Sequence, residues 1–131
     1  LCEKTPLAIA LDEELIGVFK RSDKDKMVQS IRPQYIILKP SLIGGFQGTD
    51  EWIDISKRNK VDWWITSALE GNIGLNAIAQ YTYTLQNKMP QGLGTGSLFT
   101  NIFISPLTVK NGALFYDVKV ENGWDISILN I

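Results

Sequence analysis

The sequence predicts an α/β fold in which parallel strands alternate with crossover helices, and three short apolar runs carry this prediction. The runs are residues 7–11, 35–38 and 63–65. Their ends follow one another at intervals of about 27 residues, the length of one strand plus one crossover helix. Each run is short and almost wholly apolar, as strands covered on both faces are. The order βαβαβα is typical of a parallel sheet or barrel.

Helices are expected in the intervals between these strands and after the third one. The expected helices span residues 23–30, 51–59 and 73–85. Pro33 ends the first helix, because proline disfavours helical backbone in the residues before it. Thr49 or Asp50 is expected to cap the second helix, and Asn72 the third, since a short polar side chain satisfies the free N–H groups at a helix start.

The last third of the chain departs from this alternation. Residues 92–96 form a glycine-rich turn, and residues 98–104 are expected to form a final barrel strand or a short helix. Residues 107–120 are expected to form an irregular β segment or hairpin that turns at Asn111-Gly112. Residues 124–131 are predicted to be extended.

Composition excludes several classes of function. The 131 residues carry a formal net charge of −1, so no basic field for nucleic acid and no polybasic segment for a membrane surface is present. No apolar run reaches the roughly 18 residues that a spanning helix needs. The single cysteine, Cys2, and the lack of a signal peptide lead us to expect a cytoplasmic location. Because the sequence contains no histidine, any acid–base chemistry has to use lysine, an acidic residue, tyrosine or cysteine.

Polar side chains follow each predicted strand, where parallel α/β folds place their sites. Asp12, Lys39 and the pair Thr66-Ser67 stand at these ends. A carboxylate here suits a hard metal ion, and an ammonium suits a base or a cation that faces developing negative charge. The structural alternatives are that Asp12 only forms a turn, that the hydroxyls bond locally, and that Asn72 only caps a helix.

Three motifs in this order resemble barrel strands five, six and seven of the enolase superfamily. They are IALDEEL at 9–15, LKPSLIGG at 38–45 and ITSALEGNIGL at 65–75. The second motif is most similar to the o-succinylbenzoate synthase family. Residues 92–96, followed by Leu98-Phe99, resemble the loop and strand-eight region. The resemblance covers about residues 7–104.

The resemblance implies a C-terminal fragment of a (β/α)7β barrel of the TIM type, like that of mandelate racemase and muconate lactonizing enzyme. Residues 1–106 would carry barrel strands five to eight, and residues 107–131 a segment that returns to the capping domain. The implied activity is a lyase reaction of menaquinone biosynthesis, in which a 2-succinyl-6-hydroxycyclohexadiene carboxylate is dehydrated to o-succinylbenzoate.

The resemblance also implies the site residues. The family holds Mg²⁺ on three carboxylates from consecutive strands, and Asp12 matches the last of them. Lys39 matches one of two lysines that face each other across the substrate. In the dehydratase the other lysine removes the proton and Lys39 is a cation beside the enolate, whereas in racemases the matching lysine is a second base. Glu13 would lie behind the metal ligand, and the small-molecule carboxylate substrate would contact Ser41, Gly45, Thr66, Ser67, Asn72, Gly94 and Thr95.

The sequence departs from the family where the first two metal carboxylates, the other lysine and most of the capping domain have no counterpart. Because Mg²⁺ binds weakly to one carboxylate, we expect the 131 residues alone to be inactive. Gly71 stands where serine is expected, which weakens one substrate contact. Open sheet edges also lead us to expect self-association or pairing with the missing N-terminal half.

Two other functions remain open. An N-acylamino-acid racemase or dipeptide epimerase of the same superfamily would use the same strand-end residues. A non-catalytic binding domain for nucleotides would require a Gly-x-Gly-x-x-Gly turn after the first strand, and Asp12-Glu13-Glu14 occupies that place.

Overall fold

The structure is a computed structural model that describes residues 2, 4–100 and 103–119. The chain divides into two compact units. The first comprises Leu1–Ala68 and Asn87–Gln91, and the second comprises Leu69–Gln86 and Gly92–Ile131. No helix in the part of the chain that the structure describes is both long enough and apolar enough to cross a membrane.

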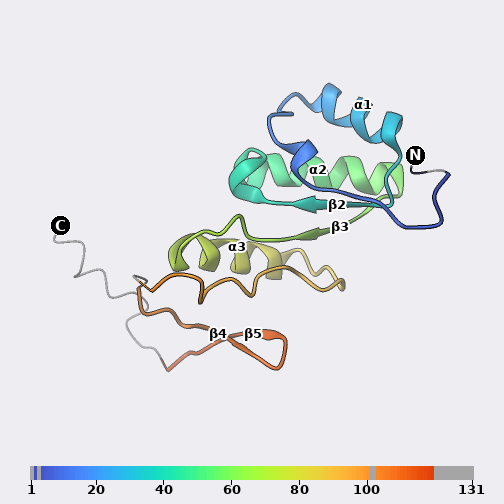
Figure 1. Ribbon diagram of the computed structural model, residues 1–131. Coiled ribbons are helices and arrows are strands. Elements are labelled where there is room, and N and C mark those ends of the chain that lie inside the picture. Colours follow the sequence, from blue (N-terminus) through green and yellow to red (C-terminus); the bar gives the residue numbers. More distant parts are fainter. Residues whose placement is uncertain (1, 3, 101–102, 120–131) are drawn as a thin grey trace. The chain divides into compact units, whose positions relative to one another are not determined.

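A parallel sheet of three strands forms the first unit (Figure 1). The strands are β1 (Ala10–Leu11), β2 (Tyr35–Leu38) and β3 (Asp62–Ile65), in that order across the sheet. Tyr35 pairs with both Ala10 and Asp62, so each crossover returns the chain to the same end of the sheet. The parallel arrangement predicted from the three apolar runs is confirmed.

The first strand is shorter than expected, and its pairing with β2 begins at Ala10. The N–H of Ile9 donates to Gln34 Oε1 at 2.9 Å. The carbonyl of Ile9 accepts from the backbone N–H groups of Gln34 and Tyr35, at 3.1 and 3.0 Å. The prediction of a strand over residues 7–11 is wrong at its first half.

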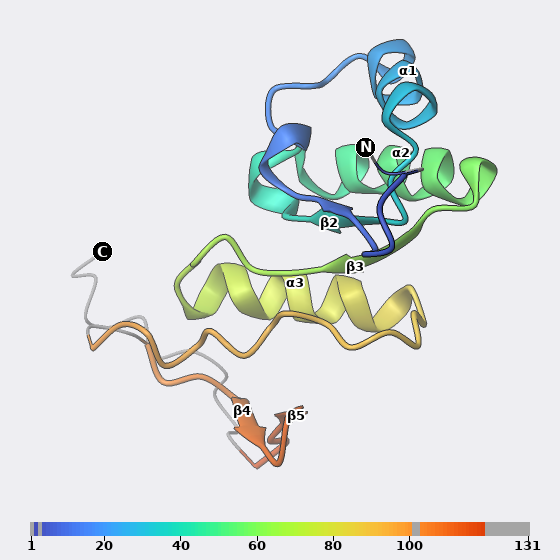
Figure 2. The ribbon, with the colours of Figure 1, turned by 45° about the vertical axis from the view of Figure 1, so that its right-hand side comes forward.

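Two helices, α1 (Arg21–Ile31) and α2 (Gly45–Asn59), lie on the same side of β2 and β3, as Figures 1 and 2 show. The strand side chains on that side, Ile36, Leu38 and Ile65, are wholly buried, as is Trp52 of α2. The intervening strand residues are only half-buried. The strands thus bury one face more fully than the other, which corrects the expectation that both faces are equally covered.

Helix α2 begins earlier than the sequence predicted, and neither Thr49 nor Asp50 caps it. The chain enters α2 through Gly44 and Gly45, whose φ angles are +102° and +69° and favour glycine. Thr49 lies inside the helix, where its Oγ1 donates to the carbonyl of Gly45 at 2.8 Å. The glycine pair forms the turn that the prediction had assigned to a polar cap.

Two basic residues end the helices of the first unit in left-handed conformations. Arg32 follows α1 with φ of 52°, and Lys60 follows α2 with φ of 56°. The predicted first helix, residues 23–30, lies within α1. Each left-handed residue stops its helix a few positions before the next strand, which is the usual role of a glycine at that place.

The second unit holds α3 (Asn72–Thr84) and a hairpin of β4 (Leu107–Lys110) and β5 (Ala113–Tyr116). Asn111 and Gly112 turn the hairpin with φ of 51° and 73°, the two positive angles of a type I′ turn. The predicted hairpin turn is confirmed. Gly71, and not Asn72, is the N-cap of α3.

The expectation of a strand or short helix over residues 98–104 is wrong for the residues described there. Residues 98–100 and 103–104 adopt turns and irregular backbone. The extended tail expected at 124–131 lies outside the described residues. The expected boundary between residues 106 and 107 stays a prediction.

Candidate functional site

The ends of the three parallel strands bring the predicted site residues of the first unit to one edge of the sheet. Asp12 directly follows β1, Lys39 follows β2 and Thr66 follows β3. The N–H of Thr66 donates to the carbonyl of Leu38 at 2.9 Å, which holds the ends of β2 and β3 level. Because carboxyl ends of parallel strands meet at one edge, this edge is where a site forms in such folds.

Asp12 and Lys39 form an ion pair at this edge. Lys39 Nζ lies 2.8 Å from Asp12 Oδ1 and donates a hydrogen bond to Asp12 Oδ2 at 2.9 Å. The Lys39 side chain is 16% exposed and that of Asp12 is 37% exposed. The ammonium spans both carboxylate oxygens, yet Oδ1 is shielded from solvent and has no aligned donor among the described residues. Both carboxylate oxygens therefore contact the ammonium, and Oδ2 accepts its aligned hydrogen bond.

Glu14 holds the turn that carries Asp12. The backbone N–H of Asp12 donates to Glu14 Oε2 at 3.0 Å. Hydrogen bonds from the backbone N–H groups of Glu14 and of Asp12 lower the pKa of the Glu14 carboxyl from its ordinary value. The turn is the short 3-10 helix η1 (Glu13–Leu15), and the wholly buried Leu15 anchors its end. Glu13, predicted to lie behind the metal ligand, is exposed.

This role of Glu14 was not predicted from the sequence. Its place in the sequence carried a signal, because Glu14 stands three residues after the end of β1 and its carboxylate can reach a nearby backbone N–H. Its carboxylate fixes the backbone of Asp12 and leaves the Asp12 side chain free to face Lys39.

A second short 3-10 helix, η2 (Pro40–Leu42), carries the chain away from Lys39. The N–H of Leu42 donates to the carbonyl of Lys39 at 2.8 Å, while Pro40 and Ile43 are buried. Two predicted substrate contacts follow in this loop. Ser41 is exposed within η2, and Gly45 is exposed at the start of α2. The Lys-Pro-Ser motif thus forms a tight turn in which Ser41 is exposed and Lys39 faces Asp12.

Thr66 and Ser67 differ in exposure. Thr66 is half-buried and its Oγ1 donates to the carbonyl of Ser67 at 3.5 Å, whereas Ser67 is 5% exposed. Local bonding of this kind supports the structural alternative for Thr66. Thr66 therefore offers more surface to a substrate than Ser67 does.

The other predicted contacts, Asn72, Gly94 and Thr95, belong to the second unit. There Asn72 and Gly94 line a cavity of about 600 Å³, and Thr95 lies between the lining residues Gly94 and Gly96. Asn72 is buried, and its Nδ2 donates to the carbonyl of Phe103 at 2.6 Å. Asn72 therefore ties α3 to the segment before β4, a role that the expected N-cap did not include.

Asp12 fits one ligand position of a divalent metal ion, but only one. Its Oδ1, which lies 2.8 Å from Lys39 Nζ, is a hard oxygen donor of the kind that Mg²⁺ prefers. Among the described residues, no group of three or more acidic, histidine or cysteine side chains lies close enough to hold a metal. The donor set in this part of the chain is therefore partial.

Comparison with solved structures defines the class of fold. No protein-family model matches the chain. The muconate lactonizing enzyme of Pseudomonas putida superposes with a TM-score of 0.73 at 20% identity, over 95% of this chain and 38% of that one. The L-Ala-D/L-Glu epimerase of Bacillus subtilis gives 0.72 at 18% identity, over 87% and 31%. These likenesses show the fold, which is part of an α/β barrel like those of these two enzymes, as the sequence predicted.

Within that class, the sequence points to one family. The chain is 56% identical to the o-succinylbenzoate synthase of Desulfotalea psychrophila over 114 residues, 87% of this chain. The solved structure of MenC from that organism superposes with a TM-score of 0.83 over 86% of this chain. The o-succinylbenzoate synthase of Vibrio cholerae is 32% identical over 95 residues. The resemblance to o-succinylbenzoate synthases is thus confirmed, and the chain spans about a third of the length of these relatives.

Proposed function

We propose that this chain supplies part of the active site of an o-succinylbenzoate synthase, a lyase of menaquinone biosynthesis. The Asp12–Lys39 ion pair carries the proposal, because it places a carboxylate and an ammonium side by side at the carboxyl ends of adjacent parallel strands. The 56% identity to a curated o-succinylbenzoate synthase supports the same assignment.

Lys39 is proposed to act on the charge of the substrate. Removal of a proton next to a carboxylate spreads negative charge onto that carboxylate, and a nearby ammonium stabilises this charge. Lys39 is only 16% exposed, so its charge is poorly screened by water, and Asp12 keeps it at the rim of the sheet. In this reaction Lys39 remains a cation, and a base outside the described residues takes the proton.

Asp12 is proposed to offer Oδ1 to Mg²⁺ while Oδ2 keeps its hydrogen bond from Lys39, with Glu14 holding the Asp12 backbone in place. When bound, the ion would act as a Lewis acid toward the substrate carboxylate. Since one carboxylate does not hold Mg²⁺ usefully, the remaining ligands have to come from another part of the polypeptide. We propose for this reason that the 131 residues alone do not catalyse the dehydration.

The proposed substrate contacts fall into two sets. Ser41 and Gly45 offer an exposed hydroxyl and an exposed backbone in the turn beyond Lys39. Thr66 and Ser67, after β3, also belong to this first set, and the second set, in the second unit, is Asn72, Gly94 and Thr95. Of these, Asn72 and Gly94 are supported by the cavity that they line.

The test is a complementation assay for Mg²⁺-dependent dehydration. The 131-residue chain is assayed alone and mixed with a polypeptide that matches the preceding part of the Desulfotalea relative. We expect product only in the mixture, and only with the metal present. Lys39→Ala should abolish it, whereas Lys26→Ala, which removes an exposed lysine of α1, should not. Activity of the chain alone, or an active Lys39→Ala mixture, would contradict the proposal.

A racemase or epimerase is the second candidate, because the placement of Lys39 at the strand end also suits a base. The same mixture, supplied with an N-acylamino acid or a dipeptide, tests it. Epimerisation without dehydration would replace the first proposal by this one.

The parallel sheet also suggests how the chain associates. Its outer strands are β1 and β3, and outer strands pair readily with other chains. We propose that the chain self-associates or pairs with the complementing polypeptide. Sedimentation analysis that shows a monomer alone and no complex in the mixture would contradict this.

A further inference from the structure

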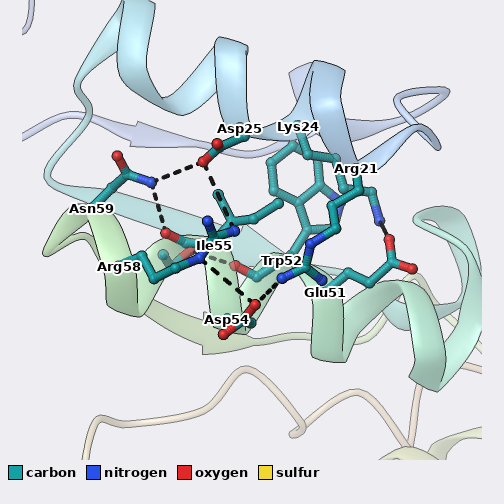
Figure 3. A network of polar contacts seen from close by, with 10 residues as sticks. Arg21, Lys24, Asp25, Glu51, Trp52, Asp54, Ile55, Arg58 and Asn59 are labelled. Carbon is teal, nitrogen blue, oxygen red and sulfur yellow. Dashed lines mark hydrogen bonds and ion pairs between the residues drawn. The ribbon is translucent and has the colours of Figure 1, made fainter.

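Lys24 is a buried cation in the interface between α1 and α2 (Figure 3). Only 1% of the residue is exposed. Its Nζ donates to the carbonyl of Gly48 at 3.2 Å and to Glu51 Oε2 at 2.9 Å, and lies 5.4 Å from the ring centre of Trp52. A buried ammonium is costly unless it is paired and hydrogen-bonded, and here all its partners stand on the first half of α2.

The first turn of α2 rests directly on the backbone of the Lys39 loop. Gly48 is buried, and a Cβ added to it would lie 2.2 Å from the carbonyl oxygen of Ile43 and 3.9 Å from Lys24 Nζ. The N–H of Gly48 donates to the carbonyl of Gly44 at 3.1 Å. Position 48 thus joins α1, α2 and the end of the loop within one small volume.

The loop between Lys39 and Gly48 is short and tightly bonded. Ile43 is 1% exposed and directly follows η2, whose last residue, Leu42, donates to the carbonyl of Lys39 at 2.8 Å. A shift of the first turn of α2 therefore moves Ile43, then η2, then the backbone of Lys39.

We propose that Lys24 is a positioning residue for Lys39: it holds the first turn of α2 against Ile43 and so fixes the loop that presents the Lys39 ammonium to Asp12. The catalytic consequence rests on the proposed function, but the coupling itself does not. Lys24 touches neither site residue and acts through Gly48.

The neighbouring ion pair on the same helices offers a matched control. Arg21, one turn before Lys24 on α1, pairs with Asp54 of α2, and both side chains are 52% exposed. This pair also bridges α1 and α2, but Asp54 lies further along α2 and Arg21 does not reach Gly48. Loss of the Arg21–Asp54 pair weakens the interface of the two helices but leaves the contact between Gly48 and Ile43 in place.

The experiment measures Lys39 without any need for catalysis. Lys24→Met and Arg21→Met chains are treated with an amine-labelling reagent, and the rate at Lys39 is read by mass spectrometry beside hydrogen exchange over residues 40–48. Because a hydrogen bond from a charged group changes an opening equilibrium by about tenfold or more, Lys24→Met should raise both rates by about tenfold. Arg21→Met should leave both unchanged.

A purely structural role for Lys24 would give a different pattern. Exchange in β2 and β3 would then rise as much as exchange over residues 40–48, and this outcome would overturn the proposal, as would unchanged labelling of Lys39. Should Lys24→Met fail to fold, Glu51→Gln is the second variant, because it removes the charge that pairs with Lys24 and keeps the side-chain volume nearly unchanged. It should give a smaller rise confined to the same loop.

The outcome is separable from that of the proposed function. Faster labelling of Lys39 in a chain that never complements dehydration would support the coupling and overturn the function. If Lys24→Met leaves the labelling of Lys39 unchanged, while the unaltered chain complements dehydration and Lys39→Ala does not, the proposed function is supported and the coupling is overturned.

Discussion

Replacing Gly48 by alanine tests the close approach of α2 to the loop before it. The new Cβ would lie 2.2 Å from the carbonyl oxygen of Ile43 and 3.1 Å from its carbonyl carbon. Both atoms belong to the backbone, and Ile43 is 1% exposed, so no side chain can rotate away to make room. Either α2 or η2 has to shift.

The expected cost follows from two opposing effects. Overpacking of a well-packed interior costs about 1–3 kcal/mol, and an overlap with rigid backbone belongs at the upper end of that range. Alanine in place of glycine inside a helix stabilises the folded state by roughly 1 kcal/mol. The net loss in free energy of unfolding is therefore about 2 kcal/mol. With a denaturant slope of about 2 kcal/mol/M, the urea midpoint should fall by about 1 M.

Urea unfolding followed by circular dichroism measures this shift, and Gly74→Ala is the control. Gly74 also lies inside a helix, α3, but its added Cβ would meet only Glu70 Cβ and Cγ, at 3.0 and 3.2 Å. Glu70 lies in the loop before α3 and has to give by only a few tenths of an ångström, so Gly74→Ala should leave the midpoint nearly unchanged. A Gly48→Ala chain as stable as the unaltered one would refute the packing argument.

Three further substitutions test other features of the chain. Gly112→Ala forces alanine into a φ of 73° and should weaken the β4–β5 hairpin by about 1 kcal/mol, seen as faster amide exchange in both strands; unchanged exchange would contradict this. Asn72→Asp removes the donor to the carbonyl of Phe103, so exchange over residues 103–107 should rise, and equal exchange would mean that this bond does not hold the segment. Lys60→Gly relieves a φ of 56° at the end of α2 and should raise stability by about 0.5–1 kcal/mol in thermal unfolding, whereas a lower melting temperature would count against the assigned strain.

The parallel sheet and its order could be predicted from the sequence, because local information determines them. The apolar runs at 35–38 and 63–65 became strands at nearly the same residues, and the equal spacing predicted their parallel pairing. The first run failed at its start for a non-local reason. The backbone N–H of Ile9 donates to the side chain of Gln34, which follows a helix in the sequence, and not to a strand.

Within the site, the sequence located Asp12 and Lys39 at one edge but did not predict that they form an ion pair. Which strand-end side chains meet depends on the register of β1 against β2, and no local pattern fixes that register. The roles proposed for them stay predictions.

Lys24 was missed because a lysine in a helix is expected to face water. Its position on the helix carried the signal, since Lys24 and Val28 are four residues apart and are the two buried residues of α1. The partner that makes this burial tolerable, Glu51, belongs to the next helix along the chain and is not identifiable from the sequence around Lys24.

The uneven pairing of the three strands has a kinetic consequence. β2 and β3 share four residue pairs, whereas β1 and β2 share only two. Parallel pairing requires closure of a long chain segment before any contact is gained, so the larger set of pairs should form first and β1 should dock last. Asp12 would then reach Lys39 only after the rate-limiting step of folding. Substitutions at Asp12 should accordingly speed unfolding and leave the folding rate nearly unchanged.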